Sequence, residues 1–346
     1  MKVSVVMSSW RPGGLDIFFA GMADQTHPDF EILFVDHRRP HRQEIVAQKV
    51  KEYGLKSFYH VPEHRCDKWY HGAAGFNSGL LIAEGDITIM LQDYAYAPPG
   101  WIERHELSHQ FRTPTFCIGP YCHLRIPDEK LPYKAANEQG LRCDLTEEPE
   151  SVKGGYDEFS IFNKSFSSSW VNQLQVQMPP EAQDPKFLEC YHSRTLKRGP
   201  IAFWYCHAKN CSFPTEIAIK AGGVDETFDK GKGPWDNEFA FRFERAGCTV
   251  WFEPQTLTFH LDPRSLMGTM PWGAMEERKA GRWSFEDGVR YQNQRYAEMA
   301  KPGERIPVGD EVVIGTGRGK PIANSPYDFA EKRGESLKLK PQWRIA

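Results

Sequence analysis

Three aspartates stand at positions where a carboxylate can take part in chemistry. Asp36 and Asp93 each follow a short, mainly apolar run, and Asp236 follows the Gly- and Pro-containing residues 231–234. A carboxylate at the end of a strand can bind a hydroxyl group or a hard cation such as Mg²⁺. A carboxylate at the start of a helix is kept ionised by backbone N–H groups and can then take the proton of an attacking hydroxyl.

The first hundred residues alternate strand-like and helix-like segments, which must position these aspartates. Runs that predict strands occupy residues 3–7, 31–35, 56–61 and 87–91, and helical spacing occupies residues 15–23, 42–53 and 73–83. This alternation is typical of a parallel sheet with right-handed crossovers. Asp36 and Asp93 therefore fall at the carboxyl edge of one sheet, where ligands bind in open α/β folds.

Regular signals fade between residues 113 and 199, where Pro, Gly and Ser clusters predict a loop-rich insertion. They return as two helices and a strand, at residues 213–221, 235–246 and 249–252, and a last helix at residues 284–299. We therefore expect one domain at residues 1–262, followed by a C-terminal extension at residues 263–346 that wraps it. Within the domain, the expected parts are residues 1–112, the insertion 113–199 and residues 200–262.

Composition and charge exclude several classes of protein. The 346 residues carry 43 Lys and Arg against 46 Asp and Glu, and the net charge of −3 disfavours nucleic acid as a partner. No window approaches the roughly 20 apolar residues that cross a bilayer, and the apolar run after Met1 is too short for a signal peptide. The eight cysteines include no C-x-x-C pair, which favours free buried thiols. We expect a cytoplasmic protein, with a peripheral position at a membrane left open.

Four blocks of sequence, in one order, carry a resemblance to a known family. They are Val3-Ser4-Val5-Val6-Met7-Ser8-Ser9-Trp10 with residues 25–36, then Ala74-Gly75-Phe76-Asn77-Ser78-Gly79, then Leu91-Gln92-Asp93-Tyr94 with Pro98-Pro99-Gly100-Trp101, and last Gly222-Gly223-Val224-Asp225-Glu226 with Trp235-Asp236-Asn237-Glu238 and His260. Together they resemble the inverting glycosyltransferases of family 2, over roughly residues 3–262. The resemblance implies the GT-A fold, an α/β architecture with a mostly parallel, Rossmann-like sheet flanked by helices.

The same resemblance implies two sides of a binding site. On the side of a nucleotide-diphosphate sugar donor it implies Ser8, Trp10, Asp36, Asn77, Gln92 and Asp93. Asp36 would contact the base and Trp10 would lie near it, although burial of Trp10 in the core is an equal alternative. On the side of the acceptor, a glycan, a glycolipid or another hydroxyl compound, it implies Trp235, Glu238 and His207.

A departing nucleoside diphosphate builds up negative charge, so the site needs a divalent cation or cationic side chains. Asp93 can hold Mn²⁺ or Mg²⁺, and the resemblance implies His260 as a second metal ligand. The family pattern has carboxylates on both sides of the middle position, where this chain has Gln92 and Tyr94. The alternative is therefore that Asp93 only hydrogen-bonds the sugar or ribose. Replacement cations would then come from Arg65, Lys68, His207 or Lys209.

Asp236 is the expected general base, because it opens a helix after a glycine-containing loop. Its alternative role is that of a helix N-cap. Glu238 is expected to bind a hydroxyl of the acceptor or the sugar.

The leading hypothesis is an inverting glycosyltransferase that uses Asp236 as its base. Because the metal motif is degenerate, a catalytically silent sugar- or nucleotide-binding protein of the same fold is the alternative. A transferase that acts on modified DNA bases is a further alternative, which the acidic balance disfavours. Nucleotidyl transfer is disfavoured because no Gly-rich phosphate loop follows the first strand.

Overall fold

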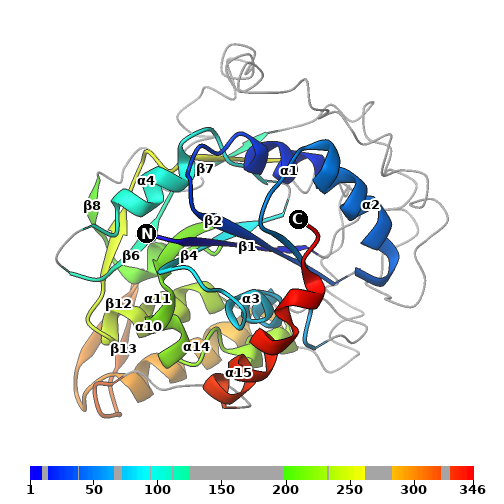
Figure 1. Ribbon diagram of the computed structural model, residues 1–346. Coiled ribbons are helices and arrows are strands. Elements are labelled where there is room, and N and C mark those ends of the chain that lie inside the picture. Colours follow the sequence, from blue (N-terminus) through cyan, green and yellow to red (C-terminus); the bar gives the residue numbers. More distant parts are fainter. Residues whose placement is uncertain are drawn as a thin grey trace.

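An eight-stranded sheet forms the centre of the computed structural model (Figure 1). The structure describes residues 1–9, 15–37, 39–65, 72–93, 95–110, 113–124, 198–231, 234–261, 283–320 and 328–346. In spatial order the strands are β3 (Phe58–Pro62), β2 (Phe30–Asp36), β1 (Val3–Ser9), β4 (Ile87–Gln92), β9 (Asn210–Pro214), β6 (Thr115–Ile118), β10 (Thr249–Phe252) and β8 (Gly199–Pro200). The first four are parallel, β9 is antiparallel to both of its neighbours, and β10 is parallel to β6. The predicted fold class, a mostly parallel sheet flanked by helices, is confirmed.

Two smaller sheets contain the other strands of the described residues. The first, of three strands, has the order β5 (Ala95–Tyr96), β11 (Thr258–Leu261), β7 (Tyr121–Leu124), and the second is a hairpin of β12 (Arg305–Val308) and β13 (Glu311–Ile314). Since β5 follows directly on β4, the three-stranded sheet extends the region where β4 ends.

Helices cover both faces of the central sheet (Figure 1). One face is covered by α1 (Leu15–Ala23), α2 (Arg39–Glu52) and α4 (Trp101–Leu107). The other face is covered by α3 (Gly72–Leu80), α10 (Thr215–Lys220), α11 (Trp235–Arg245), α14 (Phe285–Met299) and α15 (Phe329–Leu339). Three short 3₁₀ turns, η2 (Phe203–Tyr205), η3 (Glu226–Lys230) and η4 (Lys340–Trp343), lie among them.

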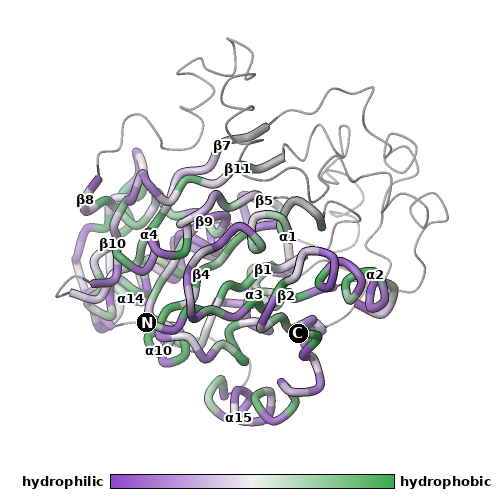
Figure 2. Tube along the Cα trace, turned by 45° about the horizontal axis from the view of Figure 1, so that its top comes forward, coloured by the Kyte–Doolittle hydropathy of each residue, from purple (hydrophilic) through white to green (hydrophobic). Residues whose placement is uncertain are grey.

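Alternation along the parallel strands explains the two layers. In β1, Val5 packs in the hydrophobic core under α1 and α2, while its neighbour Val6 packs in the core on the α3 face. Ile32 and Leu33 divide in the same way in β2. Successive side chains of a strand point to opposite faces, so a strand buried on both faces is apolar throughout. Figure 2 shows hydrophobic residues concentrated along these central strands, while α2 is largely hydrophilic.

Two glycines let α3 lie directly on β1. A Cβ atom added to Gly75 would come within 2.2 Å of the Ser8 hydroxyl oxygen, and one on Gly79 would come within 2.4 Å of a Val6 methyl carbon. Larger residues at these positions would push the helix off the strand. The second sequence block therefore owes part of its pattern to packing against the end of β1.

The structure differs from the sequence predictions in helix α15, which follows the helix predicted to be the last, and in two places where strands were not predicted. Residues 210–214, partly assigned to a helix that begins at residue 213, form strand β9, which is inserted antiparallel between β4 and β6; helix α10 begins only at Thr215. The predicted insertion begins with two strands, β6 and β7, and residues 125–197 lie outside the described part of the chain. The two strand errors have one cause, since the pairing partners of these short strands are distant in sequence and leave no local periodicity.

The C-terminal segments pack against the central domain. Helix α14, predicted at residues 284–299, begins with a capping box between Ser284 and Asp287 and contacts α11. The last residues run beside β3, where the Phe58 N–H donates to the Ala346 carbonyl oxygen at 3.0 Å. The domain boundaries themselves stay a prediction.

Within the described residues, no helix combines the length and the apolar character that crossing a membrane requires. The described cysteines Cys117, Cys206, Cys211 and Cys248 are buried and free, in agreement with the sequence.

Candidate active site

The carboxyl edge of the parallel strands brings several predicted site residues together. The strand register pairs Ser9 with Asp36 across β1 and β2, and Ser8 with Gln92 across β1 and β4. Asp93 follows Gln92 directly and is buried. Four of the six residues expected on the donor side therefore lie at one edge of the sheet.

Strand β9 connects this edge to the start of α11. The Gln92 N–H donates to the Lys209 carbonyl oxygen at 3.2 Å, so the residues before β9 lie beside the end of β4. The preceding residue, Ala208, donates its N–H to Oδ2 of Asp236 at 3.3 Å. The segment of residues 207–209 thus lies between the end of β4 and the expected base.

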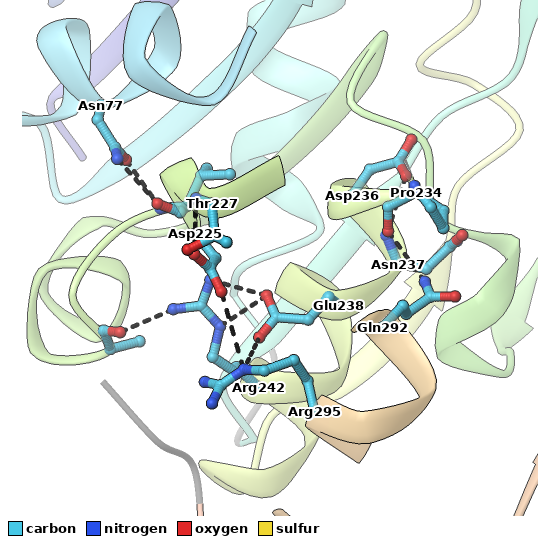
Figure 3. Close-up of polar contacts among 12 residues, drawn as sticks. Asn77, Asp225, Thr227, Pro234, Asp236, Asn237, Glu238, Arg242, Gln292 and Arg295 are labelled. Carbon is cyan, nitrogen blue, oxygen red and sulfur yellow. Dashed lines mark hydrogen bonds and ion pairs between the residues drawn. The ribbon is translucent and has the colours of Figure 1, made fainter. Parts of the chain in front are cut away.

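Asp236 lies in the first turn of α11 and is held by backbone donors (Figure 3). Pro234 is the N-cap residue, so Asp236 is inside the helix and is not its cap. Besides the bond from Ala208, Oδ1 of Asp236 accepts a hydrogen bond from the N–H of Asn237 at 3.0 Å. Both contacts fix the direction of the carboxylate.

The environment of Asp236 suits proton transfer near neutral pH. Burial of the carboxyl group raises the pKa of Asp236 to about 6, while the N–H groups of Asn237 and Ala208 and the charge of Lys209 act in the opposite direction. A base whose pKa lies slightly below the working pH is mostly ionised and still has useful proton affinity.

Aromatic and basic side chains gather beside this carboxylate. His207 is buried, and its ring meets the Tyr121 ring edge-on, with centroids 4.6 Å apart. The Lys209 ammonium nitrogen lies 4.4 Å from the centre of the Tyr121 ring and 3.2 Å from its hydroxyl oxygen. Trp235 packs on Phe76 of α3, with ring centroids 5.4 Å apart. Tyr121 was missed at the sequence level, because it lies on a strand that no local pattern reveals.

Glu238 is fully buried in an ion cluster between α11 and α14 (Figure 3). Its Oε2 lies 3.0 Å from Nε and from Nη2 of Arg242, and its Oε1 lies 3.7 Å from Nε of Arg295. Burial raises the pKa of Glu238, and the charge of Arg242 lowers it. The structure thus gives Glu238 internal partners, and its expected contact with an acceptor stays a prediction.

Asp36 also has internal partners. Its Oδ2 lies 2.9 Å from Nε2 of His60, and its Oδ1 lies 3.3 Å from Nη1 of Arg42, which also donates to the Ser9 hydroxyl. Asp36, Arg42 and His60 are all buried. Arg42 was missed at the sequence level because it stands among polar residues of α2 that look exposed. Base recognition by Asp36 stays a prediction.

Asn77 joins the second sequence block to the fourth. Its Nδ2 donates to the Val224 carbonyl oxygen and to Oε1 of Glu226, both at 2.8 Å, and its Oδ1 accepts from the Val224 N–H at 2.7 Å. These bonds hold the glycine turn of residues 222–223 against α3. A donor contact of Asn77 stays a prediction.

The register of the three-stranded sheet places His260 near Asp93 in the fold. His260 on β11 pairs with Ala95 on β5, two residues after Asp93, and with His123 on β7. A carboxylate and an imidazole are suitable donors for Mn²⁺, so the residue types fit the expected metal. No group of three His, Cys, Asp or Glu side chains that could hold a metal occurs among the residues whose side chains are described.

Other predicted residues lie elsewhere or outside the described part of the chain. Arg65, a possible replacement cation, contacts Glu226 at 3.3 Å. Trp10, Lys68 and Tyr94 fall among the residues that the structure does not describe, as does the side chain of His260.

Comparisons with known proteins support the fold. No protein-family model matches the chain, and no curated protein sequence matches it significantly. The solved structure of GalNAc-T7 with UDP, GalNAc and Mn²⁺ is similar over 86% of this chain and 48% of its own, with 12% sequence identity and a TM-score of 0.52. This likeness shows that the chain has the GT-A fold found in glycosyltransferases.

Two further solved structures are similar at lower TM-scores. TarS residues 1–349 from S. aureus with UDP-GlcNAc match 76% of this chain and 59% of their own at 9% identity and a TM-score of 0.46. The mannosyltransferase PcManGT from Pyrobaculum calidifontis with GDP-Man and Mn²⁺ matches 76% and 57% at 13% identity and a TM-score of 0.44. The chain therefore spans about half to three fifths of the length of the chains it resembles.

Proposed function

We propose that the chain is an inverting glycosyltransferase, similar to family 2, with Asp236 as its general base. One observation carries the proposal: the carboxylate of Asp236 is held by the Ala208 N–H, next to the residue whose carbonyl contacts the end of β4. Asp236 is thereby linked through Ala208, Lys209 and Gln92 to the sheet edge that carries Asp93. In open α/β folds this edge is the place where a ligand binds.

The chemistry is a single displacement at the anomeric carbon of the donor. The acceptor hydroxyl oxygen attacks that carbon, the bond to the nucleoside diphosphate breaks, and Asp236 takes the hydroxyl proton. Because one displacement occurs, the configuration at the carbon inverts. The half-exposed Trp235 and the buried His207 are proposed to border the acceptor, together with Glu238.

On the donor side, Asp36 is proposed to meet the base, and Ser8, Trp10, Asn77 and Gln92 to surround the rest of the donor. Asp93 and His260 would hold Mn²⁺ or Mg²⁺, which would offset the charge of the departing diphosphate. Lys209 lies close enough to act on the charge of Asp236, so it is the described cation best placed to help. GalNAc-T7, which shares the fold, contains UDP, GalNAc and Mn²⁺ in its solved structure, and a nucleotide-sugar donor agrees with that analogy. A glycan or glycolipid acceptor and a cytoplasmic location belong to the proposal as predictions.

The proposal is tested by incubating the protein with a panel of UDP- and GDP-sugars, with and without Mn²⁺. We expect release of the nucleoside diphosphate from at least one donor, and a transferred sugar of inverted configuration in the NMR spectrum of the product. Retention of configuration would refute the mechanism. Absence of release and of transfer with every donor would refute the activity.

A catalytically silent binding protein is the second candidate. The observation that favours it is the internal pairing of Asp36 with Arg42 and His60, which engages the carboxylate expected at the base. Calorimetry with nucleotides, combined with the turnover assay, distinguishes the two candidates. Nucleotide binding without turnover supports the silent binding protein, and absence of nucleotide binding supports neither candidate.

A further inference from the structure

The side-chain amide of Asn237 connects the helix that carries Asp236 to the turn before β9. Its Nδ2 donates one hydrogen bond to the Trp204 carbonyl oxygen at 2.9 Å and another to the Cys206 carbonyl oxygen at 2.8 Å. An amide nitrogen has two hydrogens, so both donors of Asn237 are used on this turn. The turn is further fixed by Phe203, whose ring packs 4.6 Å from that of Phe241 on α11.

This connection leads back to the expected base. Only His207 separates Cys206 from Ala208, whose N–H donates to Oδ2 of Asp236 at 3.3 Å. Asp236 and Asn237 are adjacent in sequence, so the contacts form a closed ring that runs from the helix to the turn and back to the carboxylate. If Asn237 releases the turn, the Ala208 N–H is no longer held against Asp236.

We propose that Asn237 is a positioning residue for the base, which it serves by holding the Ala208 N–H on the Asp236 carboxylate. This inference rests on the proposed function, in which Asp236 takes the acceptor proton. The hydrogen bond aims the carboxylate and favours its ionised form, since a donor N–H stabilises the anion. A second side-chain amide, that of Gln292 on α14, also contacts the start of α11 but is not expected to position the Ala208 N–H.

Gln292 is buried and donates from Nε2 to the Pro234 carbonyl oxygen at 2.9 Å, as Figure 3 shows. That carbonyl also accepts the Glu238 N–H at 3.4 Å. Gln292 therefore supports the first turn of α11 but, within the described residues, donates no hydrogen bond to the turn that holds Ala208. The two amides form a matched pair for a test.

Other ionisable groups around Asp236 must be considered in a pH measurement. Lys209 lowers the pKa of Asp236 by its charge, and His207 lies in the same turn. Cys206 and Tyr296 also feel the charge of Asp236, but burial raises the pKa of each well above its ordinary value, so both stay neutral near pH 7. His207 is thus the group to follow separately.

The test compares Asn237→Leu with Gln292→Leu, two changes of an amide to an apolar side chain of similar size. The carboxyl ¹³C signal of Asp236 is assigned with Asp236→Asn in protein labelled at aspartate, and His207 is followed by its ring signals. Losing one hydrogen bond should raise the pKa of Asp236 in Asn237→Leu by about 0.4 to 1 unit. Gln292→Leu should leave this pKa unchanged although it lowers the melting temperature. With an active donor, Asn237→Leu should also lower kcat by about tenfold with little change in KM.

The inference is overturned if the Asp236 titration in Asn237→Leu matches that of the wild type, or if Gln292→Leu moves it equally. Should Asn237→Leu fail to fold, Asn237→Ser keeps a small polar group and should shift the pKa in the same direction. The titration needs no substrate, so it can fail or succeed independently of the proposed function. Wild-type turnover by Asp236→Asn would instead contradict the function.

Discussion

Two aspartates that look alike in the sequence have opposite surroundings in the structure. Asp36, at the end of β2, is 1% exposed and meets the charged or polar side chains of Arg42 and His60. Asp236, in the first turn of α11, is partly exposed, and the hydrogen bonds it accepts from described residues come from backbone N–H groups. The carboxylate of Asp36 is paired directly with a guanidinium, while that of Asp236 is held by backbone N–H groups and feels the charge of Lys209 without an ion pair to it among the described contacts.

The difference separates a structural task from a chemical one. A buried carboxylate beside a guanidinium is costly to disturb, because removing one partner leaves the other charge buried. A carboxylate held by N–H groups against the cost of burial keeps a pKa near neutrality, about 6 for Asp236. We therefore expect substitutions of Asp236 to act mainly on turnover, and substitutions of Asp36 to act mainly on folding in addition to any loss of its proposed contact with the donor base.

The largest expected effect is on turnover in Asp236→Asn. Loss of a general base lowers kcat by roughly 10² to 10⁴. The unfolding free energy should change by less than about 1.5 kcal/mol, because Asn keeps one amide oxygen as an acceptor and no ion pair is lost. Asp310→Asn, in the exposed hairpin turn between β12 and β13, is the matched control and should keep full activity. Equal losses of kcat in Asp236→Asn and Asp310→Asn would show that the loss does not come from a base at Asp236.

The reverse pattern is expected for Asp36→Asn. It leaves Arg42 buried without its carboxylate, which should lower the unfolding free energy by about 3 to 5 kcal/mol in urea titrations. Adding Arg42→Met should restore part of the stability, since the unpaired charge is then gone. A variant Asp36→Asn as stable as the wild type would contradict the comparison.

A smaller effect is expected on metal affinity. His260→Ala should weaken Mn²⁺ binding by tenfold or more, since even groups that only support a metal ligand contribute roughly 10- to 100-fold. Calorimetry with Mn²⁺ alone measures this without turnover. His109→Ala serves as the control, because His109 hydrogen-bonds Ser212 of β9 and is not one of the proposed metal ligands. Unchanged Mn²⁺ affinity in His260→Ala would remove His260 from the proposed ligands.

The smallest expected effect concerns Lys209. Its positive charge lowers the pKa of Asp236, so Lys209→Met should raise that pKa by roughly half a unit. Since the base must be ionised, the acidic limb of the rate profile should move to higher pH. Lys220→Met, at an exposed pair with Glu216, should leave the limb in place. If the acidic limb moves to lower pH in Lys209→Met, Lys209 does not lower the pKa of the base and the prediction is wrong.

The sequence predicted the fold of residues 1–112 more completely than that of residues 200–262. The runs at residues 3–7, 31–35, 56–61 and 87–91 predict the strands β1, β2, β3 and β4, because their apolar residues are mainly buried and that signal is local. Strand β9 was missed because its partners, β4 and β6, lie more than ninety residues away in the chain. The segment that contacts Asp236 lies directly before this strand.

The surroundings of the site residues were less predictable than their positions. The strand-end positions of Asp36 and Asp93 follow from periodicity, and the structure confirms them. The partners Arg42 and Asn237 could not be predicted, because each acts through a contact that only the folded chain creates. Sequence spacing predicts the position of a residue on a strand or helix, but the neighbouring groups in the folded chain determine the pKa of its side chain.

The central claim is tested most directly by the pH dependence of kcat/KM for sugar transfer, measured side by side for the wild type and Asp236→Asn. The account predicts an acidic limb with an apparent pKa of about 6 in the wild type, set by Asp236. In Asp236→Asn the limb should vanish and the residual rate should be at least about 100-fold lower. A variant that keeps both the wild-type rate and the same limb would contradict the account.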